Sequence, residues 1–558
     1  MSGAKIQGTL PEVFERAALR FPDRGVAIFD GRGRSFERLR YDELWQRLKL
    51  AAGRWTALSL APNDRVLVSL NSSWEWIDAW LGAALCGALP AAVAPGAALG
   101  GAAAQQRRLE VIAESIGARY VVVSESARDQ AEPSVSAWLV ERLVTSARLE
   151  GLTPKTVSTP LAESSETAFL QLTSGSTGLP RAAEISHRAA LHNSYASDLA
   201  IGLPHGAPIH EWADSMVSWL PLHHDMGLVG CLLLSASFGF DLWLFQPRTF
   251  LARPRLWLEH LGLHGTAFTP APNFGYQLCL ERLQPEDRDG LDLANWSDAM
   301  TGAEMIRPET VEGFCEAFGP YGFRRETFRP CYGLAEGTLA VTFDVAGRGA
   351  RTRPAPFDAG DVAGSEVVCV GQPLVDMNVD VLAPNGDRVA AGVVGEVVVT
   401  GPSVFSGYYG DPSATAESLR AGRLLTGDLG FLADGELYIT GRLKDILIIH
   451  GQNIMPHEIE WLAEGVVGAG GAARAGAFSV DLGADGEGPV VVLEVDSRDP
   501  ERLAEIAKEI RRQVGRTLSL LLTDVVFVRR GKIPKTTSGK VQRGELRAAY
   551  LDRTLERL

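Results

Sequence analysis

The stretch Leu172-Thr-Ser-Gly-Ser-Thr-Gly-Leu-Pro-Arg181 decides how this chain is interpreted. It follows an apolar run, Ala168-Phe-Leu-Gln-Leu172, and a helical pattern begins at about Arg188. A strand that breaks into a turn rich in glycine and hydroxyl groups exposes consecutive backbone N–H groups, and no bulky Cβ blocks an approaching anion. The stretch therefore predicts a phosphate-holding loop, with an ordinary solvated loop as the alternative. It is not a Walker P-loop, because G-x-x-x-x-G-K-[ST] is absent.

The composition is that of a globular protein with several domains or subdomains, since the 558 residues are 46% apolar and 22% charged. A formal net charge of −14 argues against a nucleic-acid-binding protein, which is normally basic. From residue 501 to the end, however, 14 Lys and Arg accompany 7 Asp and Glu, a local charge of +7. This basic end predicts contact with phosphates or an acidic partner, and solvated amphipathic helices are the alternative.

We expect a cytoplasmic protein with no membrane-inserted segment. The six cysteines are scattered without a C-x-x-C pair, which indicates reduced, mostly buried thiols and neither a disulfide framework nor a zinc site. No charged segment followed by an apolar one opens the chain, so we expect no signal peptide. The uncharged run 81–104 is rich in Ala and Gly and is interrupted by Pro90 and Pro95, which favours a buried helix followed by a buried strand.

The pattern of apolar runs predicts an α/β fold. Through the first 340 residues, runs such as Arg65-Val-Leu-Val-Ser-Leu70, Tyr120-Val-Val-Val123 and Leu242-Trp-Leu-Phe245 alternate with helical patterns, as in layered, largely parallel sheets. From about residue 365 to 440, short β runs with turns indicate a small antiparallel or barrel-like β subdomain. The segment 343–366 has no clear period and is expected to be a loop or insertion.

A domain boundary is expected at residues 440–444, which gives a large domain over residues 1–440 and a small α+β domain over residues 441–558. In the small domain the sequence predicts a strand at 446–450, a helix from Pro456, a strand at 489–495, a helix at 501–514 and a strand at 524–529.

Six further motifs are present: Pro221-Leu-His-His-Asp-Met-Gly-Leu228, Thr301-Gly-Ala-Glu304, Cys331-Tyr-Gly-Leu-Ala-Glu336, Leu424-Leu-Thr-Gly-Asp-Leu429, Gly441-Arg-Leu-Lys-Asp445 and Pro534-Lys-Thr-Thr-Ser-Gly-Lys540. Together with the phosphate loop, their order and spacing resemble the adenylate-forming superfamily of acyl-CoA synthetases, luciferases and peptide-synthetase adenylation domains. The resemblance covers about residues 10 to 550. Seven motifs in one order make coincidence negligible.

A narrower similarity points to the fatty acyl-AMP ligase branch. It is carried by Ala271-Pro-Asn-Phe-Gly-Tyr-Gln-Leu-Cys279, His223-His-Asp-Met-Gly-Leu228, Phe318-Gly-Pro-Tyr-Gly-Phe323 and Gly451-Gln-Asn-Ile-Met-Pro-His-Glu-Ile-Glu460. The segment 343–366 also lies where that branch carries an insertion. The resemblance implies that ATP and Mg²⁺ are used to convert a carboxylic acid, fatty or related, to an acyl-adenylate with release of pyrophosphate. It also implies transfer to the phosphopantetheine thiol of a separate acyl carrier protein.

The same resemblance assigns the nucleotide-binding residues. The β- and γ-phosphates would be cradled by Thr173, Ser174, Gly175, Ser176, Thr177 and Gly178. The adenosine would be bound by Gly302, Ala303 and Glu304 at the adenine edge, Tyr332 stacked on the ring beside Gly333, Asp428 at both ribose hydroxyls, and Arg442 at the ribose or a phosphate. Arg181 stands where the family usually has Lys, which keeps the charge and adds a bidentate fork. By residue type alone, Tyr332 also fits a core and Asp428 a turn after Gly427.

Three residues complete the site implied by the resemblance. Glu336 would hold Mg²⁺, a hard cation that binds carboxylate and phosphate oxygens. His224 would line the acyl-pocket entrance as a movable gate, because the adjacent pair His223-His224 is poorly suited to ligate one metal. Lys540 would reach the α-phosphate and the substrate carboxylate from the small domain, with Lys444 at the hinge. That domain would close for adenylation and swing away for transfer.

Other functions stay open at the level of sequence. An acyl- or aryl-CoA synthetase of the same fold is distinguished by the dependence of its product on CoA. An enzyme that passes the adenylate to an amine is a second alternative. A non-catalytic sensor of nucleotide or acyl-adenylate would show degenerate motifs, and only Arg181-Ala182 departs from the family pattern.

Overall fold

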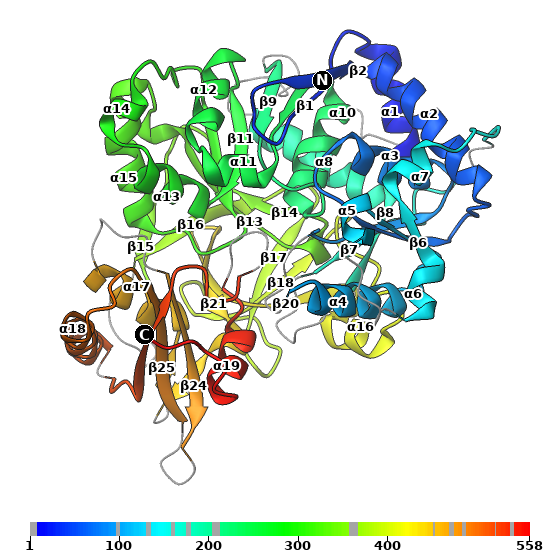
Figure 1. Ribbon diagram of the computed structural model, residues 1–558. Coiled ribbons are helices and arrows are strands. Elements are labelled where there is room, and N and C mark those ends of the chain that lie inside the picture. Colours follow the sequence, from blue (N-terminus) through cyan, green and yellow to red (C-terminus); the bar gives the residue numbers. More distant parts are fainter. Residues whose placement is uncertain are drawn as a thin grey trace.

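The computed structural model describes residues 8–95, 101–129, 136–157, 162–173, 180–202, 213–356, 366–449, 452–467, 474–482, 487–518, 520–535 and 541–558. Figure 1 shows a large body, coloured blue to yellow, with a smaller orange-to-red lobe packed against it. Over the described ranges, no helix is both long and apolar enough to cross a bilayer.

A six-stranded sheet holds the phosphate-loop motif between two of its strands. The strand order is β6-β5-β3-β4-β7-β8. Their bounds are β3 (Arg65–Ser69), β4 (Leu89–Ala92), β5 (Tyr120–Val123), β6 (Leu143–Thr145), β7 (Thr167–Leu172) and β8 (Ala182–Ser186). All neighbours are parallel except β7 and β8, which are antiparallel. The predicted layered α/β fold is therefore confirmed, with strand ends within about one residue of the apolar runs.

Helices cover the N-terminal sheets. They are α1 (Leu10–Arg20), α2 (Tyr41–Ala57), α3 (Trp74–Leu85), α4 (Gly101–Ser115), α5 (Glu125–Asp129), α6 (Ala137–Arg142), α7 (Ser146–Glu150) and α8 (His187–Gly202). Ser73 begins α3 because its side chain accepts a hydrogen bond from the backbone N–H of Trp76. Every residue of α3 except Glu75 is buried, and the buried strand β4 follows it, so the interpretation of run 81–104 as a buried helix and strand is correct for residues 81–92. Residues 101–104 begin a further helix, α4.

A second sheet has four strands in the order β2-β1-β10-β9. They are β1 (Gly25–Phe29), β2 (Phe36–Arg40), β9 (Ser215–Ser218) and β10 (Asp241–Leu244). After β9 the chain enters a short helix α9 (Asp225–Gly227), a π-helix η3 (Leu228–Leu233) and α10 (Leu234–Phe238). The helices α11 (Pro247–Ala252) and α12 (Arg255–Leu263) follow β10.

The third sheet changes from parallel to antiparallel along its length. Its path is β11-β12-β13-β14-β16-β21-β20-β18-β17, with β15 on β16 and β19 on β20. The parallel strands are β11 (Phe268–Pro272), β12 (Asp298–Gly302) and β13 (Phe328–Gly333), with helices α13 (Asn273–Arg282), α14 (Pro285–Arg288) and α15 (Pro308–Phe318) between them. The expected antiparallel strands are thus present, and they continue this sheet.

The antiparallel strands occupy the region after the motif at 331–336. They are β14 (Ala340–Phe343), β15 (Thr352–Pro354), β16 (Glu366–Pro373), β17 (Asn378–Leu382), β18 (Gly395–Thr400), β19 (Leu419–Arg420), β20 (Arg423–Ala433) and β21 (Glu436–Arg442), with α16 (Pro412–Ser418) before β19. The segment 343–366 was expected to be a loop or insertion. It contains the short strand β15, which pairs antiparallel with β16, and its residues 357–365 lie outside the described part.

Beyond Asp445 the chain forms separate sheets. A two-stranded sheet contains β22 (Leu447–Ile449) and β23 (Gln452–Ile454), and a three-stranded sheet has the order β24-β25-β26. The other bounds are α17 (Pro456–Val467), β24 (Ala475–Asp481), β25 (Glu487–Val495), α18 (Pro500–Leu518), β26 (Asp524–Arg529) and α19 (Arg543–Leu551). Two apolar cores drawn from residues 447–555 hold this region together.

One polar contact joins the C-terminal lobe to the large body. Arg307 directly precedes α15, and its Nη1 lies 2.6 Å from Oε2 of Glu464 in α17. The Arg307 guanidinium also lies 5.1 Å from the ring centroid of Trp461. In Figure 1, α17 is correspondingly seen just below α15.

Candidate active site

A cavity of about 640 Å³ lies between the large body and the C-terminal lobe. Its wall contains eight of the residues that the sequence predicted for the site: Thr173, Arg181, His224, Ala303, Tyr332, Gly333, Glu336 and Arg442. Thr173 follows β7, Ala303 follows β12, and Tyr332 and Gly333 end β13, so the wall is built where parallel strands end. This position at the carboxyl ends of strands is where α/β sheets usually bind ligands.

The phosphate loop is closed at its base by one backbone hydrogen bond. The N–H of Thr173 donates to the carbonyl of Arg181 at 2.8 Å, which continues the β7–β8 pairing to the loop ends. The predicted loop residues Ser174, Gly175, Ser176, Thr177 and Gly178 lie outside the described residues. Both ends of the loop are therefore positioned at the cavity.

The motif at 302–304 is fixed by close packing. A Cβ on Gly302 would lie 2.6 Å from the carbonyl oxygen of Cys331, so only glycine allows this approach of β12 to β13. Ala303 has a φ of +66°, a left-handed conformation, and lines the cavity. The Glu304 carboxylate accepts a 2.6 Å hydrogen bond from the N–H of Phe274 in the first turn of α13. Gly302 and the Glu304 side chain thus support the wall, whereas Ala303 forms it.

Asp428 is buried and forms a polar triad with the buried Tyr332 and the half-exposed Arg442. The Tyr332 hydroxyl donates to Asp428 Oδ2 at 2.7 Å, and Arg442 Nε donates to Oδ1 at 2.8 Å. Asp428 lies in β20 opposite Arg442 in β21, so it is a strand residue and not part of a turn. Burial and the Asp428 charge raise the pKa of Tyr332, which keeps its hydroxyl a donor. Each carboxylate oxygen retains lone-pair capacity for a further donor such as a ribose hydroxyl.

Glu336 forms a second polar group with Tyr408 and Arg181. The Tyr408 hydroxyl donates to Glu336 Oε1 at 2.6 Å, and the Arg181 guanidinium carbon lies 5.3 Å from the centroid of the Tyr408 ring. Burial raises the pKa of Glu336, and the Tyr408 hydrogen bond opposes that effect. Tyr408 was not identified from the sequence. It lies 72 residues from Glu336, and nothing in the local segment Gly407-Tyr-Tyr-Gly410 indicates which group it contacts.

His224 lies at the cavity wall, at the start of α9. Its Nδ1 is 2.6 Å from Oδ1 of Asp225 and 3.3 Å from the N–H of Met226. Burial lowers the pKa of the neighbouring His223 to about 3, which keeps its imidazole neutral. Both histidines are half-buried and both line the cavity.

Part of the cavity lining is apolar. It includes Ile201, Gly230, Leu234, Met300, Leu339 and Phe343. A Cβ on Gly230, in the π-helix η3, would lie 2.9 Å from Leu339 Cδ2, so glycine maintains space at this position. The cavity thus combines charged and apolar lining residues, which suits an amphipathic acid.

Cys331 also lines the cavity, and its thiol is a hydrogen-bond donor. Its Sγ donates to the carbonyl of Thr301 at 3.3 Å. Burial raises the pKa of this thiol to about 12. All six cysteines are free, and four of them are buried, as the sequence predicted.

The C-terminal lobe contributes Lys535 and Gln542 to the wall. These two residues flank the segment 536–540, which contains the predicted catalytic Lys540 and lies outside the described residues. The backbone of Lys535 forms an isolated antiparallel β-bridge with Val541, and the Lys535 Nζ donates to Glu494 Oε2 at 3.1 Å. The predicted hinge Lys444 lies on the same wall.

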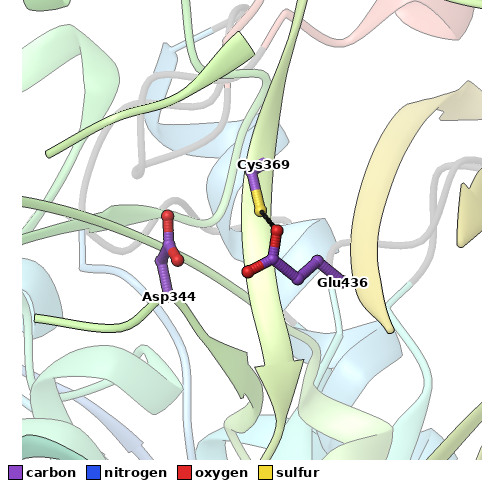
Figure 2. A group of neighbouring side chains, drawn as sticks. All are labelled: Asp344, Cys369 and Glu436. Carbon is purple, nitrogen blue, oxygen red and sulfur yellow. Dashed lines mark hydrogen bonds between the residues drawn. The ribbon is translucent and has the colours of Figure 1, made fainter. Parts of the chain in front are cut away.

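A cluster outside this cavity has the composition of a metal site. One ligand atom from each of Asp344, Cys369 and Glu436 lies within 4.8 Å of the others (Figure 2). Arg351 fills the position of a cation, because its Nη2 donates to Asp344 Oδ1 at 2.7 Å, to Glu436 Oε1 at 2.9 Å and to the Cys369 sulfur at 3.3 Å. The cluster is therefore an ion-pair network that anchors the residues just before β15.

A family model described as AMP-binding enzyme matches residues 14–409. The chain belongs to the AMP-binding enzyme family. A putative acyl-CoA synthetase of Caulobacter vibrioides is 31% identical over 97% of this chain and 95% of its own length. JamA of Moorena producens, a medium-chain-fatty-acid–[acyl-carrier-protein] ligase, is 33% identical over 80% of this chain and 79% of its own length.

Solved structures agree with this assignment to the AMP-binding enzymes. A structure from a study of fatty acyl-adenylate ligases of E. coli and L. pneumophila superimposes with a TM-score of 0.86 at 29% identity, covering 98% of each chain. The predicted adenylate-forming superfamily and its fold are confirmed, and relatives of the fatty acyl-AMP ligase branch are among the matches. Membership of this family implies use of ATP by a ligase that adenylates an acid.

Proposed function

We propose that this enzyme activates a fatty or related carboxylic acid as its acyl-adenylate and then passes the acyl group to the phosphopantetheine thiol of an acyl carrier protein. The observation that carries the proposal is one cavity whose wall holds both charged and apolar residues. An oxygen of the substrate carboxylate attacks the α-phosphorus of ATP, and the bond to the β-phosphate oxygen breaks to release pyrophosphate. Two anions must meet, so charge neutralisation and positioning supply most of the rate.

The nucleotide end of the cavity fits ATP by its donor and acceptor chemistry. Asp428 accepts the ribose hydroxyls, Tyr332 stacks on adenine, and Arg442 contacts the ribose or a phosphate. The loop 173–178 and Arg181 bind the departing phosphates. His224 gates the apolar end, where the acyl chain lies.

Mg²⁺ fits beside Glu336, because a half-buried carboxylate in the same cavity wall as Arg181, at the end of the phosphate loop, is a hard oxygen ligand in need of positive charge. When bound there, the ion neutralises phosphate charge. Lys540 neutralises charge on the α-phosphate, in keeping with the wall positions of Lys535 and Gln542 on either side of its loop. We further propose that residues 1–440 and 441–558 move as two domains about Lys444, closing for adenylation and turning for transfer.

The carrier protein as acceptor is supported by the name of the relative JamA, and free CoA by the name of the Caulobacter relative. The basic end of the chain favours an acidic carrier, whose attraction weakens with salt. ATP–pyrophosphate exchange with acids of increasing chain length tests the first half-reaction. Mass spectrometry of thioesters formed with holo carrier protein or with CoA tests the second. Robust acyl-CoA at physiological CoA concentration, without carrier loading, would overturn the carrier assignment and leave acid adenylation standing.

A further inference from the structure

Tyr408 joins two charged groups that come from distant parts of the chain. Its hydroxyl donates to Glu336 Oε1 at 2.6 Å, and its ring face carries the Arg181 guanidinium at 5.3 Å from the centroid. All three residues line the same cavity. Glu336 and Arg181 are the residues proposed above for metal and phosphate binding, and Tyr408 contacts both.

The Tyr408 side chain has little freedom to move. It is 8% exposed, and the Phe405 ring packs edge-on against it at 4.9 Å between centroids. Its backbone N–H donates to Thr415 Oγ1 at 2.8 Å, and residues 406–409 pair with β8 directly after Arg181. The Phe405 contact restrains the ring and the backbone pairing restrains the main chain, so the groups that Tyr408 contacts are held in place as well.

The two contacts use different parts of the tyrosine. The neutral hydroxyl fixes one carboxylate oxygen of Glu336, and a hydrogen bond to an ionised acceptor is stronger than one between neutral groups. The ring face attracts the flat guanidinium of Arg181, which stacks on an aromatic surface in a way that an ammonium cannot. The Tyr408 ring therefore provides a stacking surface for Arg181, which stands where the family usually has Lys.

We propose that Tyr408 is a positioning residue that holds the metal-binding carboxylate of Glu336 and the phosphate-binding guanidinium of Arg181 in one fixed arrangement. The inference rests on the proposed function, in which Glu336 binds the divalent cation. It adds to that function a residue that acts through Glu336 and Arg181. Substitution by phenylalanine distinguishes the two contacts, because it removes the hydroxyl that binds Glu336 and keeps the ring that binds Arg181.

The test measures Mn²⁺ binding by electron paramagnetic resonance in the presence of a non-hydrolysable ATP analogue, and pyrophosphate binding by calorimetry. For Tyr408→Phe we expect Mn²⁺ affinity to fall about tenfold, as for loss of one hydrogen bond to a charged group, with pyrophosphate affinity retained. For Tyr408→Leu, both affinities should fall. Tyr409→Phe is the matched control, because the Tyr409 ring carries Arg65 at 5.6 Å and does not line the cavity.

Two further variants make the result decisive. Thr415→Val loosens the backbone of Tyr408 without touching Glu336, and it should weaken Mn²⁺ binding in the same direction by a smaller factor. If Glu336→Gln weakens Mn²⁺ binding and Tyr408→Phe does not, this inference is overturned and the proposed function stands. If Glu336→Gln leaves Mn²⁺ affinity unchanged, the metal role of Glu336 fails first, and the role of Tyr408 at the metal fails with it.

Discussion

Single residues of the site are held by protein partners in this structure. Asp428 is the clearest case, since Tyr332 and Arg442, which both line the cavity, each donate to one of its carboxylate oxygens and so fix its orientation. A carboxylate that is already oriented loses little conformational entropy when a ligand binds. The same arrangement means that a truncation to alanine would leave a buried tyrosine hydroxyl without an acceptor, which costs stability as well as binding.

Asp428→Asn is therefore the sharper test of ribose binding. The amide keeps the shape but loses the charge and one acceptor, so we expect ATP affinity to fall about tenfold or more while the thermal unfolding midpoint changes little. Isothermal titration calorimetry and scanning calorimetry measure the two quantities. Asp380→Asn serves as the control, because Asp380 in β17 pairs with the exposed Arg388 away from the cavity. Normal ATP binding in an early-melting Asp428→Asn protein would assign Asp428 a purely structural role.

His187 gives the protein a predicted sensitivity to acid. Its Nδ1 accepts a 3.1 Å hydrogen bond from the N–H of Leu10, and burial lowers its pKa from 6.5 to about 4. Between these two pH values the unfolded chain binds a proton that the folded chain excludes, so stability falls as the pH drops from 6.5 to 4, by roughly 3 kcal/mol for this residue. In His187→Gln, which retains an acceptor, denaturant unfolding across this range should show a shallower dependence on pH. If the pH dependence of the free energy of unfolding is the same in the variant, the acid sensitivity does not come from His187.

At the scale of elements, apolar runs located strands well but did not reveal their order. The predicted runs starting at Arg65, Tyr120 and Leu242 correspond to β3, β5 and β10, because strands buried in a sheet core are continuous in Val, Leu and Trp. Short β runs separated by turns predicted the antiparallel strands after residue 365. They did not predict that these strands continue the parallel sheet through the pairing of β13 with β14. Strand order depends on hydrogen bonds between distant segments, which leave no local pattern.

For the candidate site, the sequence indicated residues within motifs but not their partners elsewhere in the chain. Residues within sequence motifs, such as Tyr332 and Glu336, line one cavity, and their roles in binding remain predictions. Partners outside those motifs were missed: Tyr408 and Arg351 carry no distinctive local sequence, and each matters because it donates a hydrogen bond to a carboxylate that is distant in the sequence. Charge pairing in a low-dielectric interior is a property of the folded chain.

The Arg351 cluster predicts a large stability effect. Arg351→Met would leave the carboxylates of Asp344 and Glu436 buried without their main cation, and we expect a loss of about 3 kcal/mol in the free energy of unfolding at neutral pH. Arg353→Met is the control, because its partner Asp434 is 73% exposed and such surface pairs contribute less than about 1 kcal/mol. Equal losses in both variants, measured by denaturant unfolding, would contradict this account.

The pH dependence of the same variant has a definite sign. Arg351 lowers the pKa of Glu436, so the pair contributes stability above the ordinary carboxyl pKa and loses it as the pH falls through the folded-state value. In Arg351→Met the unpaired carboxyls bind protons more readily. The stability gap between the variant and the parent protein should therefore shrink on acidification.

For the whole molecule, the cavity wall depends on how the C-terminal lobe docks. Arg307 links the two bodies through Glu464 and Trp461. Arg307→Ala should weaken this docking, so we expect a larger radius of gyration by small-angle scattering and a slower adenylation half-reaction, with transfer from a supplied acyl-adenylate largely spared. The control is Arg325→Ala, which removes an exposed pair with Glu312 within the large body. An unchanged radius of gyration together with normal pyrophosphate release would show that Arg307 does not hold the C-terminal lobe against the large body.

Cys331 has a consequence for the fate of the activated acid. An acyl-adenylate is a strong electrophile, and a thiolate beside it would capture the acyl group as a dead-end thioester on the enzyme itself. With a pKa of about 12 and its S–H engaged by the Thr301 carbonyl, the Cys331 sulfur stays protonated and poorly nucleophilic. Under the proposed function, we expect Cys331 not to compete with the carrier thiol for the acyl group, although its sulfur lines the cavity.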